Sequence, residues 1–307
     1  MPREGRRAPS RGRRPVAPPV PVPDVDLQTA HAVARIEVDP NRPTGRMLFV
    51  DGIECSYIDL ADPTHLEFSY VRRMADVVDL VRPAPAPIEA VHLGGGGCTL
   101  ARYLAAARPR SRQVVYELDA GLVQLAREYL GLRTTPGLRV RVGDARQRLT
   151  ERPDGSADIV FGDAFNGVVV PPQLATTEFV NDVKRVLRPG GVYVLNVIDC
   201  PPLRVSRTCA ATLLSSFQHV ALVVNRDLLR ERDAGNAVFA ASDVALPVAE
   251  LARVAARGQF PDDVLDRAEV TRFAGTAHPL HDGERERWLS LAPPPDLSVP
   301  IAGDSPA

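Results

Sequence analysis

Aromatic residues are scarce in this chain, and net charge is almost absent. Phe, Trp and Tyr make up 5% of the 307 residues, and the formal net charge at pH 7 is −1. Few aromatic rings leave little surface on which nucleic-acid bases stack, and a near-neutral chain produces no field that attracts nucleic acid or an anionic membrane. The composition therefore predicts neither a nucleic-acid partner nor membrane association.

Metal-binding patterns and long apolar runs are missing as well. The four cysteines form no C-x-x-C pair, and the six histidines show no metal-ligand spacing, so we expect no metal site. No segment approaches the roughly 20 apolar residues of a membrane-spanning helix. The N-terminal arginines are not followed by the apolar core of a secretory signal. A reducing cytoplasm is the expected compartment.

The two ends of the chain have the composition of loose segments. Residues 1–24 are rich in arginine and proline, which predicts a disordered arm, because like charges repel and proline removes backbone donors. A solvated tail is favoured there over a tether to nucleic acid or membrane. The chain is again proline-rich from Pro293, and residues 258–307 are predicted to form a partly loose C-terminal extension.

Residues 25–82 are predicted to form a small antiparallel β-hairpin unit followed by a helix. Alternating apolar residues run over 35–38 and 53–60, and a short apolar run covers 47–50. The residues between these runs, 41–45 and Asp51-Gly52, have turn chemistry. Residues 64–82 carry apolar side chains at helical spacing.

From residue 88 onward, apolar strands alternate with helical segments. The predicted strands are 88–93, 113–117, 138–142, 158–161 and 192–197, with closing strands at 219–225 and 236–241. Such alternation is typical of parallel strands joined by right-handed crossovers. The fold class is therefore predicted as α/β, with a Rossmann-like, doubly wound, mostly parallel sheet over residues 83–257.

A run of glycines follows the first of these strands: Gly94, Gly95, Gly96 and Gly97. Glycine lets a ligand approach the backbone closely, although a merely tight turn would need glycine too. The run lacks the Lys of a phosphate loop, and it fails the G-x-G-x-x-G pattern because Thr99 and Leu100 stand where the last glycine would be. The loop is therefore predicted to be a neutral cradle rather than a pyrophosphate site.

Three acids stand at the ends of successive strands: Glu117, Asp144 and Asp163. The carboxyl ends of parallel strands meet at one edge of a sheet, where ligands bind. Glu117 is suited to accept hydrogen bonds from ribose hydroxyls, Asp144 is suited to the exocyclic amine of adenine, and Asp163 lies at the catalytic edge. The alternatives are a solvated strand-end acid for Glu117, a helix N-cap for Asp144 and a loop cap for Asp163. Asp119 is predicted to be the N-cap of the helix after Glu117.

Taken together, the motifs have the order of class I S-adenosylmethionine-dependent methyltransferases. They are His92–Gly97, Tyr116–Asp119, Gly143–Ala145, Asp163–Phe165 and Leu187–Gly191. Within that fold the chain resembles the spermidine synthases, or polyamine aminopropyltransferases. The similarity lies in the hairpin Phe49–Gly52 and in Asp163–Phe165 followed by Pro171–Leu174 and Thr177–Phe179. It covers roughly residues 35 to 245.

The resemblance implies transfer of an aminopropyl group from decarboxylated S-adenosylmethionine to an amine. Glu117 would hold the ribose of this co-substrate and Asp144 with Ala145 its adenine, beside the glycine run. Asp163 would deprotonate the attacking amine, because an alkyl ammonium with a pKa of about 10.4 is not a nucleophile. The resemblance also suggests a homodimer.

The chain departs from the family at positions that carry negative charge. The acid of the family's glycine loop is replaced by Gly97, and the second acid of its D-x-x-D pair is replaced by Asn166. The acid after the hairpin tyrosine, here Tyr70, is absent too. Burying an ammonium without carboxylate partners is costly, which predicts a degraded diamine site. Tyr70, Asn166 and Asp59 are the candidate acceptor-side residues, with Asp59 as a replacement for the lost charge.

Three functions are compatible with these residues, because a fold alone does not assign chemistry. The preferred one is an aminopropyltransferase with an altered amine acceptor. The second is a methyltransferase that uses intact S-adenosylmethionine, which Gly97 would no longer repel. The third is a catalytically silent nucleoside-binding homologue.

Overall fold

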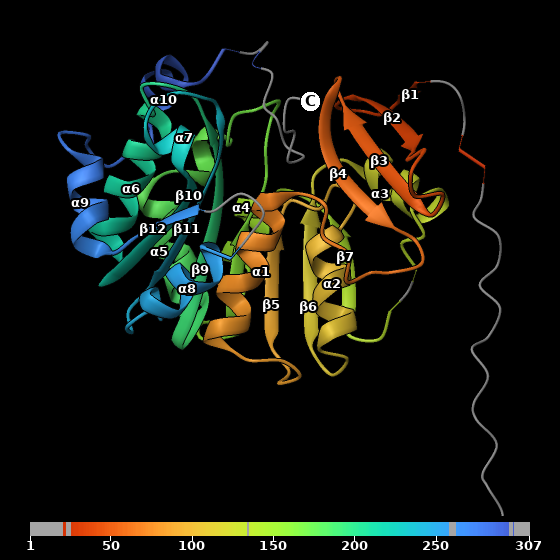
Figure 1. Cartoon of the computed structure of the whole chain (residues 1–307), viewed down its shortest axis with the longest axis horizontal. Coiled ribbons are helices and arrows are strands. Elements are labelled where there is room, and N and C mark those ends of the chain that lie inside the picture. The colour runs from red at the N-terminus through yellow and green to blue at the C-terminus, as the bar shows by residue number, and fades with distance from the viewer. Residues whose placement is uncertain (1–20, 23–25, 134, 258–261, 295–296, 298–307) are drawn as a thin grey trace, which may run out of the picture.

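The computed structural model describes residues 21–22, 26–133, 135–257, 262–294 and 297. The predicted basic arm 1–24 lies almost wholly outside the described residues, as does the last part of the predicted C-terminal extension. Figure 1 shows a small sheet beside a larger sheet that carries helices on both faces.

The small sheet is the predicted N-terminal antiparallel unit. Its strands pair in chain order: β1 (Leu27–Gln28), β2 (Val33–Val38), β3 (Gly45–Val50) and β4 (Ile53–Asp59). Asp51 and Gly52 connect β3 to β4 with φ angles of 51° and 81°. Positive φ at both central residues fits the right-handed twist of the two strands, so this dipeptide makes the tight turn that the sequence predicts.

Helix α1 (Ser69–Val81) begins five residues later than the predicted start at residue 64. Two acids upstream hold the backbone in turns instead. Asp59 Oδ1 accepts hydrogen bonds from the backbone N–H groups of Ala61 and Asp62, and Asp62 Oδ1 accepts one from Thr64 N–H. Such local side-chain bonds compete with helix formation, which explains the later start.

The large sheet has eight strands in the order β12-β10-β11-β9-β8-β5-β6-β7. Strands β5 (Glu89–Leu93), β6 (Arg112–Glu117), β7 (Leu138–Val142), β8 (Ala157–Gly162) and β9 (Leu187–Asp199) run parallel to one another. Strands β10 (His219–Asn225), β11 (Gly235–Ser242) and β12 (Asp262–Leu265) pair antiparallel. The prediction of a mostly parallel α/β sheet is confirmed. The strand order reverses beside β5, and ligands bind at such a point in open sheets.

Two hydrophobic layers cover the faces of this sheet. Along β8, Ile159 and Phe161 belong to the layer under α1, α2 (Thr99–Ala107) and α8 (Val248–Ala255), while Val160 belongs to the layer under α5 (Thr177–Val186) and α6 (Arg204–Ser216). Side chains alternate between the faces of a strand, so a continuous apolar run fills both layers. Helix α3 (Ala120–Glu128) packs between β6 and the small sheet, which ties the two sheets together.

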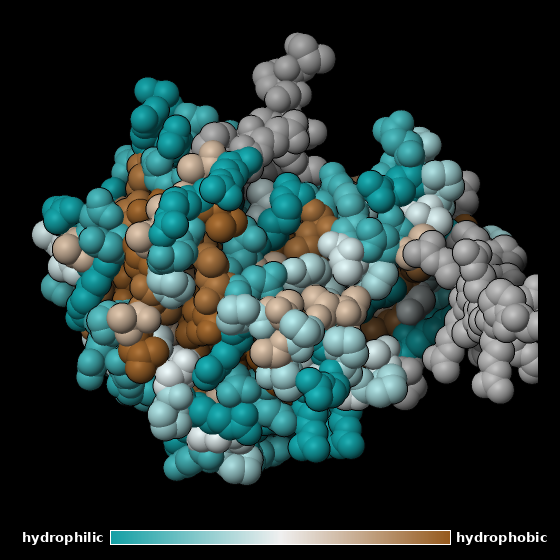
Figure 2. Space-filling view, turned by 60° about the horizontal axis from the view of Figure 1, so that its bottom comes forward, coloured by the Kyte–Doolittle hydropathy of each residue, from teal (hydrophilic) through white to brown (hydrophobic). Residues whose placement is uncertain are grey.

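The remaining short elements lie at the sheet edges and around the later strands. They are α4 (Ala145–Thr150), the 3-10 turn η1 (Pro172–Leu174), α7 (Arg226–Leu229), α9 (Arg267–Ala274) and α10 (Arg285–Leu291). Figure 2 shows apolar side chains gathered on the half of the surface that carries α8, α9 and β12, while the other half is mostly hydrophilic. None of the helices in the described part of the chain combines the length and apolarity needed to cross a membrane.

The chain beyond residue 257 adds structure that sequence reasoning did not predict. Strand β12 pairs with β10, α9 packs on α6, and α10 buries Trp288 completely, with its indole N–H donating to Val170 O at 2.8 Å. The division between 83–257 and 258–307 stays a prediction, but β12 belongs to the main sheet. One local signal was available: Asp266 and Glu269 form a capping box at the start of α9.

The burial of Trp288 predicts that this late segment contributes to global stability. Replacing Trp288 with Ala leaves a cavity, and we expect a loss of about 3–5 kcal/mol in the free energy of unfolding. Leu289, its neighbour on the same helix, is 42% exposed, so Leu289→Ala should cost at most about 0.5 kcal/mol. Urea unfolding of both variants measures this difference. Equal small losses would contradict the packing described for α10.

Candidate functional site

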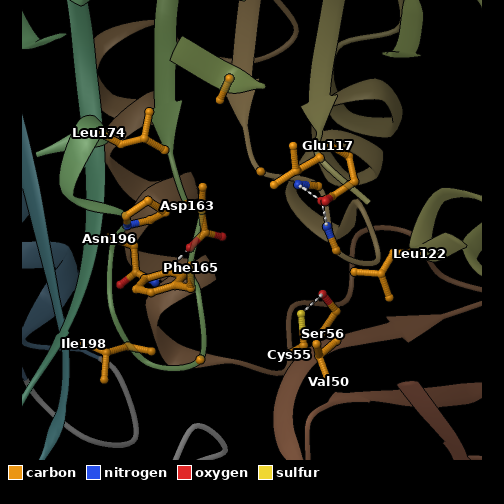
Figure 3. A pocket seen from close by; sticks show the side chains of 18 of the residues that line it. Val50, Cys55, Ser56, Glu117, Leu122, Asp163, Phe165, Leu174, Asn196 and Ile198 are labelled. Atoms are coloured by element: carbon orange, nitrogen blue, oxygen red, sulfur yellow. Dashed lines mark hydrogen bonds between the residues drawn. The ribbon is translucent and has the colours of Figure 1, made fainter. Parts of the chain in front are cut away.

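A pocket opens at the carboxyl ends of β5, β6, β8 and β9, where the small sheet meets the large one. Among the described residues, its lining includes four carboxylates, Glu54, Glu117, Asp144 and Asp163, and no lysine, arginine or histidine. Figure 3 shows two opposing sides. Glu117 and Ser56 lie on one side, while Asp163, Asn196 and Phe165 lie on the other. Several carboxylates gathered in one pocket favour a positively charged ligand.

The glycine loop makes the floor of this pocket. Gly94 has a φ of 95°, and a Cβ atom there would lie 2.3 Å from the backbone oxygen of Asp163. Gly96 also has a positive φ of 45°, and Cys98, with a φ of 59°, is the N-cap of α2. Only glycine allows the loop to lie this close to the end of β8. The three glycines Gly94, Gly95 and Gly96 line the pocket, as predicted for a close backbone approach.

Glu117 is held in place by three backbone N–H groups. Its Oε2 accepts hydrogen bonds from Gly95 N at 2.8 Å and Gly96 N at 3.1 Å, and its Oε1 accepts one from Asp119 N at 2.9 Å. Hydrogen bonds to a charged acceptor are stronger than neutral ones. The carboxylate therefore fixes the glycine loop against the end of β6, rather than projecting into solvent.

Asp144 and Asp119 both cap helices. Asp144 Oδ1 accepts from Gln147 N at 2.8 Å at the start of α4, and Asp119 Oδ1 accepts from Gly121 N at 2.8 Å at the start of α3. The prediction for Asp119 is confirmed. Asp144 fits the N-cap interpretation and also lines the pocket together with Ala145, so capping fixes the position of a carboxylate that a ligand can reach.

Asp163 stands at the end of β8 on the other side of the pocket. Its backbone N–H donates to Leu93 O at 2.9 Å, and its Oδ1 accepts from Asn196 Nδ2 at 2.9 Å. Burial raises the pKa of Asp163 to about 6, because desolvation disfavours the ionised form. A carboxyl with a pKa this close to neutrality in a pocket marks a candidate general base.

Tyr70 and Cys55 complete the surroundings of Asp163. Tyr70, near the start of α1, is buried and lines the pocket, and its acceptor-side role stays a prediction. Burial, together with the nearby Asp163 charge, raises the pKa of Tyr70 well above its usual value. Burial raises the pKa of Cys55 to about 12. Both groups are therefore neutral at physiological pH.

The other two predicted acceptor-side residues do not line the pocket. Asn166 is exposed, and its backbone pairs with Val169 in the loop after β8. Asp59 is buried at the end of β4, where it accepts a hydrogen bond from Arg42 Nη1 at 2.8 Å and holds the following turn. The expectation that Asp59 supplies charge to the acceptor side was wrong, because its carboxylate is used within the small sheet.

Gly97 also lies outside the pocket lining. Its N–H donates to Ser56 Oγ at 3.0 Å, and an added Cβ would lie 2.4 Å from Ile58 Cδ1 and 2.9 Å from Ser56 Cβ. Strand β4 thus occupies the space that a side chain at residue 97 would need.

Sequence reasoning missed several polar residues that line the pocket, among them Glu54, Asn196 and Asn236. Asn196 interrupts the apolar strand β9, and Asn236 lies near the start of β11. A polar residue is unusual within a strand that is buried on both faces. Asn196 could therefore have been recognised in the sequence as a candidate site residue. Within the described residues, no three His, Cys, Asp or Glu side chains are arranged to hold a metal ion.

Comparison with known proteins gives the following similarities. A methyltransferase domain model matches residues 90–191. The polyamine aminopropyltransferase of Vibrio vulnificus is 34% identical over 151 residues, which are 48% of this chain and 49% of that protein. The polyamine aminopropyltransferase of Chromobacterium violaceum is 30% identical over 46% of this chain and 53% of its own length. The chain thus spans about half the length of these curated relatives.

Solved structures give a longer match. The crystal structure of a probable spermidine synthase from Corynebacterium glutamicum is 32% identical, covers 88% of this chain and 98% of its own, and superposes with a TM-score of 0.79. The spermidine synthase of Thermotoga maritima is 14% identical with a TM-score of 0.58, which supports the fold.

The tight approach at Gly94 predicts a large cost for any side chain there. Gly94→Ala adds a steric clash with Asp163 to the cost of a positive φ, and we expect a loss of about 3 kcal/mol or more in the free energy of unfolding. Gly52→Ala is the matched control, because its φ of 81° is similar and nothing lies within 4 Å of the added Cβ; it should lose about 1–2 kcal/mol. Equal losses in urea unfolding would refute the close packing of the loop against β8.

The raised pKa of Asp163 predicts that removing its charge increases the stability of the fold, by an amount that depends on pH. The folded-state pKa of about 6 lies above the usual 3.8, so the fold loses stability as pH rises from about 4 through 6 and Asp163 ionises while partly removed from water. Asp163→Asn should escape this loss, and its stability relative to wild type should rise between pH 4 and pH 7. Asp154→Asn, an exposed control, should show no such trend in urea unfolding. A constant difference for Asp163→Asn would contradict the burial.

Proposed function

Because the chain belongs to the spermidine synthase (polyamine aminopropyltransferase) family, we propose that it transfers an aminopropyl group from decarboxylated S-adenosylmethionine to an amine. The observation that carries this proposal is a pocket lined by four carboxylates, with Asp163 beside a glycine loop. Both substrates of such a transfer are cations: one contains a sulfonium, and the other arrives as an ammonium. A negative, partly desolvated pocket suits both.

The side of the pocket around Glu117 fits the nucleoside of the donor. Glu117 would accept hydrogen bonds from the ribose hydroxyls, and Asp144 would accept one from the exocyclic amine of adenine. The backbone of Gly94–Gly96 leaves room for the donor to lie against the loop. Leu118, Leu122 and Leu174 supply apolar surface in the same lining, as a purine ring requires.

Asp163 would act as the general base. The amine nitrogen gives a proton to the carboxylate, its lone pair forms a bond to the carbon next to the sulfonium, and the carbon–sulfur bond breaks to release methylthioadenosine. A pKa of about 6 leaves Asp163 ionised at neutral pH, and it is a stronger base than an ordinary carboxylate. The sulfonium is already a good leaving group, so the remaining contribution is positioning.

The acceptor side differs from a site built for two ammonium groups. The neutral members of the lining include Tyr70, Asn196 and Asn236 as polar groups and Phe165 and Ile198 as apolar ones. The second acid of the family's D-x-x-D pair is Asn166 here, and Asn166 lies outside the lining, so this motif provides no second carboxylate for a second ammonium. We therefore propose an acceptor that carries one reacting amine on a mainly neutral body. The expected homodimer stays a prediction.

One observation favours a second candidate, methyl transfer from intact S-adenosylmethionine. Strand β4 fills the space beside Gly97, so an acid cannot stand there to bind the amine of the aminopropyl group or to repel a carboxylate. Intact S-adenosylmethionine carries that additional carboxylate. The choice between donors therefore depends on the rest of the pocket.

Incubation of the full chain with each donor and a panel of monoamines and diamines separates these functions, with mass spectrometry of the products as the measurement. Release of methylthioadenosine with an aminopropylated amine supports the proposal, and preferred use of monoamines supports the altered acceptor side. Release of S-adenosylhomocysteine from intact S-adenosylmethionine would overturn it in favour of methyl transfer. Binding of either nucleoside product without turnover would indicate a silent homologue.

If Asp163 is the base, removing its carboxylate should lower the reaction rate and leave nucleoside binding almost unchanged. Asp163→Asn should lower kcat about 10²- to 10⁴-fold, because no carboxylate accepts the amine proton. Binding of methylthioadenosine, measured by calorimetry, should change less than about threefold, since Glu117 and Asp144 are untouched. Asp154→Asn again serves as the control with unchanged kcat. A full rate in Asp163→Asn would rule out the assigned base.

A further inference from the structure

Two buried amides interrupt the apolar face of the sheet that α1 covers. Strands β9 and β11 are antiparallel, and Asn236 pairs in register with Ile198, while Val238 pairs with Asn196. Their neighbours on this face are apolar, but Asn196 and Asn236 are only 1% and 6% exposed. Burying an amide costs free energy unless the amide is hydrogen-bonded. The hydrogen-bond partners of these two side chains should therefore explain why amides stand here.

The partners form a chain that ends on Asp163. Asn236 Nδ2 donates to Asn196 Oδ1 at 3.1 Å, and Asn196 Nδ2 donates to Asp163 Oδ1 at 2.9 Å. An ionised carboxylate only accepts, so Asn196 must present its nitrogen to Asp163 and its oxygen to Asn236. Each amide therefore has a single orientation that allows both hydrogen bonds, and both side chains donate in the direction of the carboxylate.

Two residues outside the pocket lining hold the other end of this series of hydrogen bonds. Arg73 of α1 donates from Nη1 to the backbone oxygen of Asn236 at 2.9 Å. The same guanidinium makes two hydrogen bonds of 2.7 Å to Asp262 of β12, and both side chains are at most 10% exposed. A bidentate pair of this kind fixes direction as well as distance. Helix α1 and β12 therefore hold the start of β11, and Asn236 with it.

We propose that Asn236 and Asn196 are positioning residues that act in series on Asp163. Asn236 fixes the orientation of the Asn196 amide, and Asn196 holds Oδ1 of the carboxylate so that Oδ2 is presented to the attacking amine. This inference rests on the proposed role of Asp163 as the base. Neither residue need touch the reacting atoms for the effect, and Asn236 acts only through Asn196.

No cation among the described residues of the pocket competes with the amides for Asp163. Ionisable groups that line the hollows around it are Tyr70 from α1, Cys55 from β4, and His92 and Cys98 in an adjoining hollow; the wider pocket adds Glu54, Glu117 and Asp144. Burial lowers the pKa of His92 to about 4, so it is neutral. The hydrogen bond from Asn196 lowers the pKa of Asp163 against the effect of burial, so losing it should raise that pKa further.

The experiment is a ¹³C NMR titration of the full chain labelled at aspartate carboxyl carbons, with the Asp163 signal identified by its loss in Asp163→Asn. Asn196→Leu should raise the pKa of Asp163 by about one to two units, the shift that corresponds to losing a hydrogen bond to a charged group. Asn236→Leu and Asn236→Ala should raise it by roughly half to one unit, although neither touches Asp163. Asn236→Gln, which keeps the amide, should recover part of the shift.

Ser242→Ala is the matched control. Ser242 is buried in the same strand β11, and it donates a 2.9 Å hydrogen bond to Gly191 O at the opposite end. Its loss should leave the Asp163 titration unchanged. If both Asn236→Leu and Asn236→Ala titrate like Ser242→Ala, the serial role is refuted. The titration uses no substrate, so absence of aminopropyl transfer by the wild type would sink the proposed function without deciding this inference.

Discussion

The site depends on the carboxylate of Glu117, which joins two neighbouring strand ends. Three backbone N–H groups, from Gly95, Gly96 and Asp119, converge on its two oxygens. The contact fixes the glycine loop after β5 relative to the end of β6, and the close approach of Gly94 to Asp163 fixes the same loop relative to β8. One anionic group thereby sets the floor of the pocket before any ligand binds, so little ordering is left for the binding step to supply.

Charge imposes the second constraint. Three acids of the pocket, Glu117, Asp144 and Asp163, are held by neutral donors, namely backbone N–H groups and the amide of Asn196, which Asn236 holds in turn. Neutral donors keep the acids in place without cancelling their charge, so the negative potential remains available to cationic substrates. The raised pKa of Asp163 is a consequence of this design, because burial without a cation disfavours its ionised form.

Much of this could be predicted from the sequence, because the signals were local. Strand and helix alternation predicts the parallel sheet, and Gly94, Glu117, Asp144 and Asp163 stand at strand ends where a parallel sheet must bring them together. Other residues were expected in the pocket but lie outside it, because their positions are set by contacts with residues distant in the sequence. The sequence alone suggests Asp59 as a pocket acid, but in the structure Arg42 binds its carboxylate. The sequence also gives no sign that Ile58 of β4 lies beside Gly97. The C-terminal elements were missed because β12 and α10 are short, and their burial comes from tertiary packing.

The central claim is that this preorganised pocket binds an adenosine moiety through Glu117 and Asp144, with the reacting sulfur directed toward Asp163. A crystal structure of the full chain with methylthioadenosine tests it most directly. The account predicts the ribose hydroxyls on Glu117, the adenine beside Asp144, and the sulfur on the side of the pocket that Asp163 and Asn196 form. A nucleoside bound elsewhere, or one in this pocket that leaves both carboxylates without contact, would contradict it.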